Sequence, residues 1–206
     1  MSSWFRSEQA VSRVDPRKSG HYQGRRIIKR DTKIDGGVSI GGYPREAIVV
    51  DSEKYPAIQI LYQRAKINAK SDGLITQRSA IRAVYETVDD VFIRRSEESL
   101  DNFRESRGIV DDKKVALDAF IAAGVGVCRH MALTAGVLLE KLIEEGYLRG
   151  RASVNRNSYN HSAHEWARFE ESVGGIYIID VAQKYQGTLQ GAILLNKWPY
   201  AKPDEF

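Results

Sequence analysis

The feature that most constrains the fold is an apolar stretch of helical length in the second half of the chain. It reads CRHMALTAGVLLEKLIEEG, from Cys128 to Gly146. Between Met131 and Ile143 the side chains leave almost no polar face over about three helical turns. A helix that is apolar all round is packed on every side. The sequence therefore predicts a buried central helix that begins at Cys128, becomes polar at its end and stops at Gly146.

Amphipathic patterns with helical spacing precede this stretch. They predict a helix within residues 55–70, a second within 71–95, a short polar helix within 96–108 and a partly helical segment over 111–124. Gly124 closes the last of these segments, as glycine often does at the end of a helix.

After residue 147 the apolar residues recur with period two, which is typical of strands. We expect strands over 147–154, 163–169 and 175–183, with a polar loop at 155–162 and the connection EESVGG at 170–175. Helices followed by an antiparallel sheet indicate an α+β domain built around the central helix.

The first 45 residues differ in character from the rest of the chain. Residues 1–34 contain nine Lys or Arg and three acidic residues, and KIDGGVSIGGYP (33–44) contains four glycines and a proline. We expect residues 1–45 to be a basic, Gly/Ser/Arg-rich extension, partly disordered or wrapped on a domain formed by 46–206, with KIDGGVSIGGYP as a loop. The basic charge would suit nucleic acid or an anionic surface, but sparse aromatic residues favour a solvated tail.

Several classes of protein are disfavoured by composition. A single cysteine among 206 residues excludes an intramolecular disulfide framework and a zinc site with several thiolates. No apolar run has the length of a membrane span, and the N-terminus lacks the apolar core of a secretory signal. We therefore expect a cytoplasmic protein, or one exported without a Sec-type signal peptide. His161 and His164 could supply two metal ligands at most, so no metal or other cofactor is expected.

Cys128 has two interpretations. A lone cysteine in an apolar helix is most often a packing residue. However, the start of a helix stabilises a thiolate through the peptide dipoles and free N–H groups of the first turn. Gly124 and Gly126 leave room beside the sulfur, and the Cys128 N–H could donate to an oxyanion.

A nucleophilic thiol also needs a base and a group that orients the base. Of the four histidines, His21 lies in the basic extension, and His130 points about 200° away from the sulfur around the helix. His161 and His164 remain.

His164 and Asp180 face each other if paired residues on the two strands have numbers that sum to 344. A minimal Gly174–Gly175 turn would give 349 and place the two side chains on opposite faces. If His164 and Asp180 are paired, the loop between their strands must be bulged or odd in length. Four residues then share the opposite face of the sheet: Ala167, Phe169, Tyr177 and Ile179.

Three segments in order resemble the core of the transglutaminase-like, papain-like superfamily of cysteine enzymes. They are GVGVCRHMALTAGVLLEKLIEEGYLRGRASV, HEWARF and YIIDVAQ, and the resemblance covers about residues 115–185. It implies that Cys128 is the nucleophile, His164 the base and Asp180 the orienting residue. If His161 were the histidine paired with Asp180, the mechanism would be unchanged. The second oxyanion donor of such enzymes is not identifiable, with Gln59, Gln63 and Gln77 as candidates.

The resemblance implies a thiol hydrolase that acts on an amide bond in a protein or peptide. A cysteine protease is the first expectation, and a protein glutamine deamidase or a transglutaminase is the alternative because the same acyl-enzyme serves all three. A non-catalytic interaction or nucleic-acid-binding module that uses the basic N-terminal segment is a hypothesis of a different class.

Overall fold

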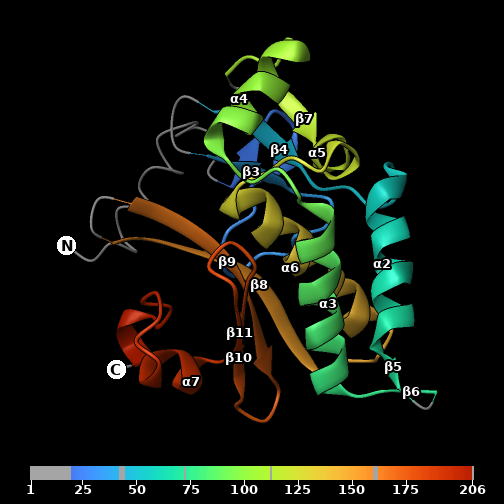
Figure 1. Ribbon diagram of the computed structural model, residues 1–206, viewed down its shortest axis with the longest axis vertical. Helices are drawn as coiled ribbons and strands as arrows, with labels where there is room; N and C mark the ends of the chain where they lie inside the picture. Colours follow the sequence, from blue (N-terminus) through green and yellow to red (C-terminus); the bar gives the residue numbers. More distant parts are fainter. Residues whose placement is uncertain (1–19, 42–44, 72, 112, 160–161, 206) are drawn as a thin grey trace.

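The chain folds as an α+β protein around one central helix. A computed structural model describes residues 20–41, 45–71, 73–111, 113–159 and 162–205. Helix α6 (Cys128–Glu144) packs against an antiparallel sheet and also against α2 (Pro56–Ala69) and α3 (Gln77–Val91). Figure 1 shows α2 and α3 side by side, with the long strands of the sheet crossing the molecule beyond α6. No described helix is both long and apolar enough to cross a membrane.

The prediction of a buried central helix is confirmed. All residues of α6 from Arg129 to Glu140 are buried, because neighbouring elements cover the whole circumference of the helix. Gly136 permits a close contact with the N-terminal region, since a Cβ there would lie 2.6 Å from Cδ1 of Ile34. The Cys128 end of the helix is less buried than its middle.

The other predicted helices are also found. The side chain of Thr76 caps α3, and Ser96 caps α4 (Glu97–Ser106), as hydroxyl residues commonly do at helix starts. Helix α5 (Leu117–Ala123) ends at Gly124 in the left-handed conformation, with φ of 63°. The segment before α5 is not helical but forms strand β7 (Lys114–Ala116).

The main sheet has four antiparallel strands in the order β11-β10-β9-β8. They are β8 (Gly150–Tyr159), β9 (Ser162–Glu171), β10 (Ile176–Asp180) and β11 (Tyr185–Thr188). The predicted loop over 155–162 is wrong for the described residues of that range, because β8 continues to Tyr159 and β9 begins at Ser162, while residues 160–161 lie outside the described part of the chain. Two of the polar residues of this part of β8 are buried and paired: Asn155 donates to Ser153 Oγ at 2.8 Å, and Asn157 donates to the carbonyl oxygen of Pro199 at 2.6 Å.

The register between β9 and β10 differs from the expected one by two residues. Ile178 lies opposite Arg168 and Ile179 opposite Ala167, so paired residues sum to 346 rather than 344. A shift of two keeps every side chain on its face. Continuing the register by one pair sets Asp180 across from Trp166, and therefore diagonal to His164. Five residues separate the paired Glu170 and Ile176, so the loop is odd in length as predicted and is not the minimal turn.

A second, smaller sheet combines the N-terminal region with the middle of the chain. Strand β3 (Val38–Ile40) pairs antiparallel with β4 (Ala47–Val49), which pairs parallel with β7. Figure 1 shows this sheet beside α4 and α5 at one end of the molecule. The predicted loop over KIDGGVSIGGYP is therefore wrong at Val38–Ile40.

The described part of the N-terminal region packs on the rest of the domain. Strands β1 (His21–Tyr22) and β2 (Arg25–Arg26) form a short hairpin. Beyond it, the fully buried Ile34 enters the main core. The Glu140 carboxylate on α6 accepts hydrogen bonds from the backbone N–H groups of Ile34 and Asp35, at 2.6 and 2.8 Å. These contacts show that residues 34 and 35 are integrated with the central helix.

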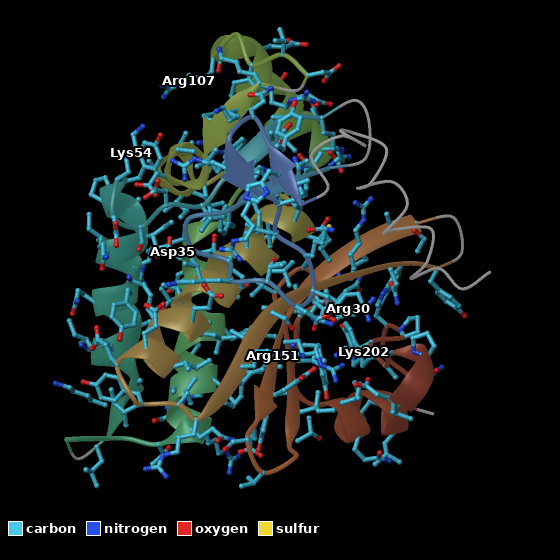
Figure 2. All side chains as sticks on the ribbon, turned by 180° about the vertical axis from the view of Figure 1, so that it is seen from behind. Arg30, Asp35, Lys54, Arg107, Arg151 and Lys202 are labelled. Carbon is cyan, nitrogen blue, oxygen red and sulfur yellow. The ribbon has the colours of Figure 1, made fainter. Side chains whose placement is uncertain are left out.

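The chain after β11 covers part of the main sheet. It comprises α7 (Leu189–Leu194) and the short 3₁₀ helix η1 (Pro203–Glu205), and a second apolar cluster joins Tyr200 to Trp166. Glu170 on β9 binds both Lys202 and Arg151, each at 2.8 Å, and Figure 2 labels these two basic residues. The two remaining strands, β5 (Lys70–Ser71) and β6 (Leu74–Ile75), form a small hairpin between α2 and α3.

Candidate active site

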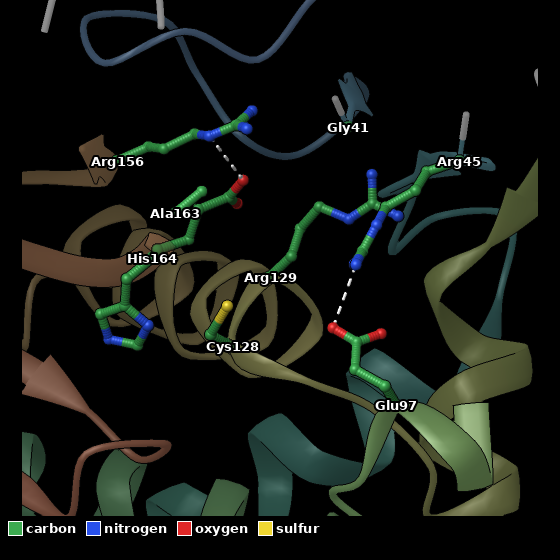
Figure 3. Close-up of a pocket in the computed structure, with 9 residues that line it drawn as sticks. Gly41, Arg45, Glu97, Cys128, Arg129, Arg156, Ala163 and His164 are labelled. Carbon is green, nitrogen blue, oxygen red and sulfur yellow. Dashed lines mark hydrogen bonds and ion pairs between the residues drawn. The ribbon is translucent and has the colours of Figure 1, made fainter. Parts of the chain in front are cut away.

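Cys128 lies on the wall of a small pocket. The cavity measures about 210 Å³. Its lining residues come from α6, from β8 and β9, from the start of α4 and from the N-terminal region: Gly41, Arg45, Glu97, Cys128, Arg129, Arg156, Ala163, His164 and Glu165. Figure 3 shows the Cys128 sulfur between the imidazole of His164 on one side and Arg129 and Arg45 on the other, with Arg156 on the His164 side. The pocket therefore brings together the predicted nucleophile and the predicted base.

The glycine before Cys128 is required by packing. A Cβ on Gly126 would lie 2.7 Å from Cβ of His130 and 2.8 Å from Cε1 of Phe92, closer than two carbon atoms without a bond can approach. The Val127 N–H donates to Nδ1 of His130 at 3.2 Å, which fixes the turn that leads into α6. Cys128 then follows as the first helical residue, as the sequence predicted.

His164 and Asp180 are in direct contact. Nε2 of His164 lies 2.5 Å from Oδ2 of Asp180, and both side chains are buried. Because Nε2 is engaged by the carboxylate, Nδ1 is the ring nitrogen that remains for the thiol, and Figure 3 shows a ring nitrogen directed toward Cys128. The diagonal register permits this contact, since diagonal neighbours on adjacent strands lie within reach of long side chains.

The environment of His164 favours its protonated form. Burial lowers the pKa of His164, but hydrogen bonds with Asp180 and Cys128, together with their negative charges, outweigh it and raise the pKa to about 9. The imidazole is therefore charged at neutral pH.

Asp180 is held by groups that the sequence patterns did not reveal. The Tyr200 hydroxyl donates to Oδ2 at 2.8 Å, and the Gln183 N–H donates to Oδ1 at 3.0 Å. The Trp198 ring meets the His164 ring edge to face at 4.9 Å, while the fully buried Trp166 stacks at 6.1 Å. The C-terminal segment thus shields the pair from water. The sequence of this C-terminal segment has only scattered aromatic residues, so no local pattern could have predicted that it packs over His164 and Asp180.

A buried charged cluster supports the start of α6 from the other side. Arg129 forms an ion pair with Glu46, which also lies 3.1 Å from Nε of Arg104 and 3.6 Å from Nε2 of His130. Burial raises the pKa of Glu46, but the His130 hydrogen bond and Arg129 charge prevail and lower it to about 2. Burial lowers the pKa of His130 to about 4, so this histidine is neutral.

Arg129 and His130 differ in their access to the pocket. Arg129 reaches the pocket, whereas His130 is fully buried and does not line it. Glu46 had no sequence signal, because it follows a glycine-rich stretch that gave no sign of a buried acid.

The remaining candidates do not join the pocket. His21 is exposed on β1, and His161 lies outside the described residues. None of Gln59, Gln63 and Gln77 lines the cavity, and Gln59 instead donates to the carbonyl oxygen of Ser52 at 3.3 Å. Within the described ranges, no three His, Cys, Asp or Glu side chains are grouped as a metal site requires.

Basic residues of the described N-terminal region are engaged within the domain. Arg25 lies 2.7 Å from a carboxylate oxygen of Asp51, and Lys33 lies 2.6 Å from one of Glu144. Arg6, Arg13, Arg17 and Lys18 lie outside the described residues.

Comparison of this chain with protein-family models, curated proteins and solved structures found no match.

Proposed function

We propose that this protein is a thiol hydrolase that acts on an amide bond, with a papain-like, transglutaminase-like core. Cys128 is the nucleophile, His164 the general base and Asp180 the residue that orients the base. One observation carries the proposal: His164 lies between the Cys128 thiol in the pocket and the buried carboxylate of Asp180. Nε2 of His164 is 2.5 Å from Oδ2 of that carboxylate. A nucleophile, a base and an orienting acceptor in this order are what covalent catalysis by a thiol requires.

The geometry supports a two-stage reaction. In the resting pair, Nδ1 of His164 already holds the proton of Cys128, which leaves a thiolate beside an imidazolium. The thiolate attacks the amide carbonyl, forming an S–C bond as the carbonyl π electrons move to oxygen. The backbone N–H of Cys128, free at the helix start, donates to this oxyanion. When the tetrahedral intermediate collapses, the C–N bond breaks and the leaving nitrogen takes the proton from His164. Water, deprotonated by His164, then attacks the thioester and releases the acid and the thiol.

The acyl acceptor distinguishes the alternatives. Water after cleavage of a peptide bond makes the protein a protease, water after loss of ammonia from a glutamine makes it a deamidase, and an amine makes it a transglutaminase. A protease is preferred because proteolysis is the commonest chemistry of the superfamily that the sequence resembles.

The test is the rate at which iodoacetamide alkylates Cys128 between pH 4 and 10. If His164 activates the thiol, the wild-type protein reacts fast at neutral pH, and His164→Ala loses most of that rate and changes its pH dependence. His21→Ala is the matched control, since His21 is exposed on β1 and should leave the rate unchanged. A thiol that reacts equally in wild type and His164→Ala would refute the proposed base.

The interaction module remains a second hypothesis, and the structure determines how it must be tested. Removing residues 1–34 would delete the buried Ile27 and Ile34 and would destabilise the domain. Removing residues 1–19 instead leaves the described core complete. The enzyme hypothesis predicts that this truncation retains amide hydrolysis and that Cys128→Ala abolishes it. The interaction hypothesis predicts that the truncation abolishes the function of the protein and that Cys128→Ala leaves it intact.

A further inference from the structure

The pocket around Cys128 carries an excess of positive charge. Three arginines line it, Arg45, Arg129 and Arg156, and His164 adds a fourth positive charge when protonated. Among the described residues, Glu97 and Glu165 are the only acids in the lining, so its net charge is about +1 whether the proton shared by Cys128 and His164 is on sulfur or on nitrogen. A narrow cleft of one sign concentrates ligands of the opposite sign.

The arginines are only partly satisfied by these acids. Arg156 lies directly opposite Glu165 in the β8–β9 register, but its Nε is 3.7 Å from the nearest carboxylate oxygen, too far for a hydrogen bond. Within the described part of the chain, the buried Nε atoms of Arg156 and Arg129 have no hydrogen-bond acceptor. Buried donors without an acceptor cost free energy, which an anionic ligand would recover.

The third arginine is held by an exchangeable partner. Arg45 binds Glu97 at 3.0 Å, and both side chains are more than one-third exposed. Exposed ion pairs contribute little to stability, so Arg45 can exchange Glu97 for a ligand carboxylate. Arg129 is paired with Glu46 through its terminal nitrogens, so what it offers a ligand is its Nε, which has no acceptor among the described residues.

We propose that this arginine-lined pocket binds a carboxylate that the substrate carries beside its scissile amide. The inference rests on the proposed function and specifies its substrate class: a peptide with an Asp or Glu side chain, or a free C-terminal carboxylate, next to the bond that is broken. The cavity of about 210 Å³ fits one such residue rather than a long stretch of peptide. Guanidinium groups suit this task because their planar donors match a carboxylate.

The experiment compares two alkylating reagents of nearly equal size. Iodoacetate and iodoacetamide both react as the Cys128 sulfur displaces iodide, which leaves with the electrons of the C–I bond. They differ in that iodoacetate carries a carboxylate. The ratio of the two rates reports anion binding beside the sulfur, and the same chain unfolded in urea supplies the reference ratio. We expect the folded protein to favour iodoacetate about tenfold more than the unfolded chain does, and added salt to reduce this preference.

Variants locate the effect. Arg156→Gln and Arg45→Gln should each lose much of the preference, whereas Glu165→Gln should increase it because a repelling carboxylate is removed. Arg151→Gln is the matched control: Arg151 is on the same strand as Arg156 but binds Asp31 and Glu170 away from the pocket. Should Arg156→Gln fail to fold, Glu165→Gln and the salt series still test the proposal.

Peptide protection against iodoacetamide distinguishes the two sources of the carboxylate. An Asp peptide is compared with its Asn counterpart, and a peptide with a free C-terminus is compared with its amide. The acidic member of at least one pair should protect Cys128 better than its neutral partner.

The outcomes separate this proposal from the proposed function. A ratio equal to that of the unfolded chain, or one unchanged in Arg156→Gln, Arg45→Gln and Glu165→Gln, overturns the carboxylate site while leaving an activated thiol possible. A high ratio with an iodoacetamide rate independent of His164 supports the carboxylate site and refutes the hydrolase. A thiol that is inert to both reagents overturns both proposals. If neither acidic peptide protects Cys128 better than its neutral partner, only the carboxylate site is overturned.

Discussion

Replacing Asp180 by Asn tests the central pair of the site most directly. The carboxylate accepts from His164 Nε2 at 2.5 Å and supplies the negative charge that, with Cys128, outweighs the burial of the imidazole. Without it, only Cys128 opposes the effect of burial, and the pKa of His164 should fall from about 9 toward 6.5. At 1.36 kcal/mol per pKa unit, the difference corresponds to about 3 kcal/mol of lost preference for the imidazolium.

The sign of the stability effect follows from the raised pKa. Because the folded-state pKa of His164 lies above its ordinary value of 6.5, its contribution to the free energy of unfolding is complete below pH 6.5. That contribution is lost as the pH rises through about 9. Wild-type protein should therefore lose stability between these pH values, and Asp180→Asn should show little of this loss.

The assay is an NMR titration of the histidine ring resonances, with His164 assigned by comparison with His164→Gln. Tyr200→Phe is the matched control, because it removes the hydroxyl donor to the same oxygen of Asp180 and keeps the charge. It should leave the pKa of His164 high. An Asp180→Asn protein in which His164 still titrates near pH 9 would refute the assignment of Asp180 as the source of the shift.

Three further predictions concern the frame of the site, and urea unfolding measures each. Gly126→Ala should cost about 1–3 kcal/mol, because its Cβ would lie 2.8 Å from Phe92, and an unchanged midpoint would contradict the packing described here. Ile34→Ala should cost about 2–5 kcal/mol, and a smaller loss would mean that Ile34 is not a core residue. Glu46→Gln should cost about 3 kcal/mol at neutral pH by leaving the Arg129 charge unpaired. Since the pKa of Glu46 is lowered from 4.5 to about 2, that cost should diminish as the pH falls from 4.5 toward 2. A cost that stays constant over this range would argue against the ion pair of Glu46 with Arg129 as its source.

The elements that sequence could predict are those specified by local patterns. The apolar run of α6 fixes a buried helix, and the alternation in β9 and β10 fixes which residues share a face. His164 and Asp180 could be assigned to one face on this basis, because a register shift of two residues does not change the face.

The remaining features depend on contacts between distant segments. Asn155 and Asn157 have the composition of a loop, but the C-terminal segment supplies a partner for Asn157 when it packs on β8. Glu46 is buried because Arg129, more than eighty residues later, lies beside it. Local pattern contains no information on either pairing, so the polar strand and the charged cluster were missed.

The hairpin between β9 and β10 offers a place to attach something to this molecule. Its loop, residues 171–175, has Val173 at its tip with 89% of its surface exposed. His164 lies seven residues before Glu171 on β9, about 23 Å away at the rise of an extended strand. Lengthening a flexible loop costs little entropy. A fluorophore or affinity tag inserted at Val173 would therefore leave the Cys128 pocket open to solution, so that binding could be followed on a surface or in a single molecule.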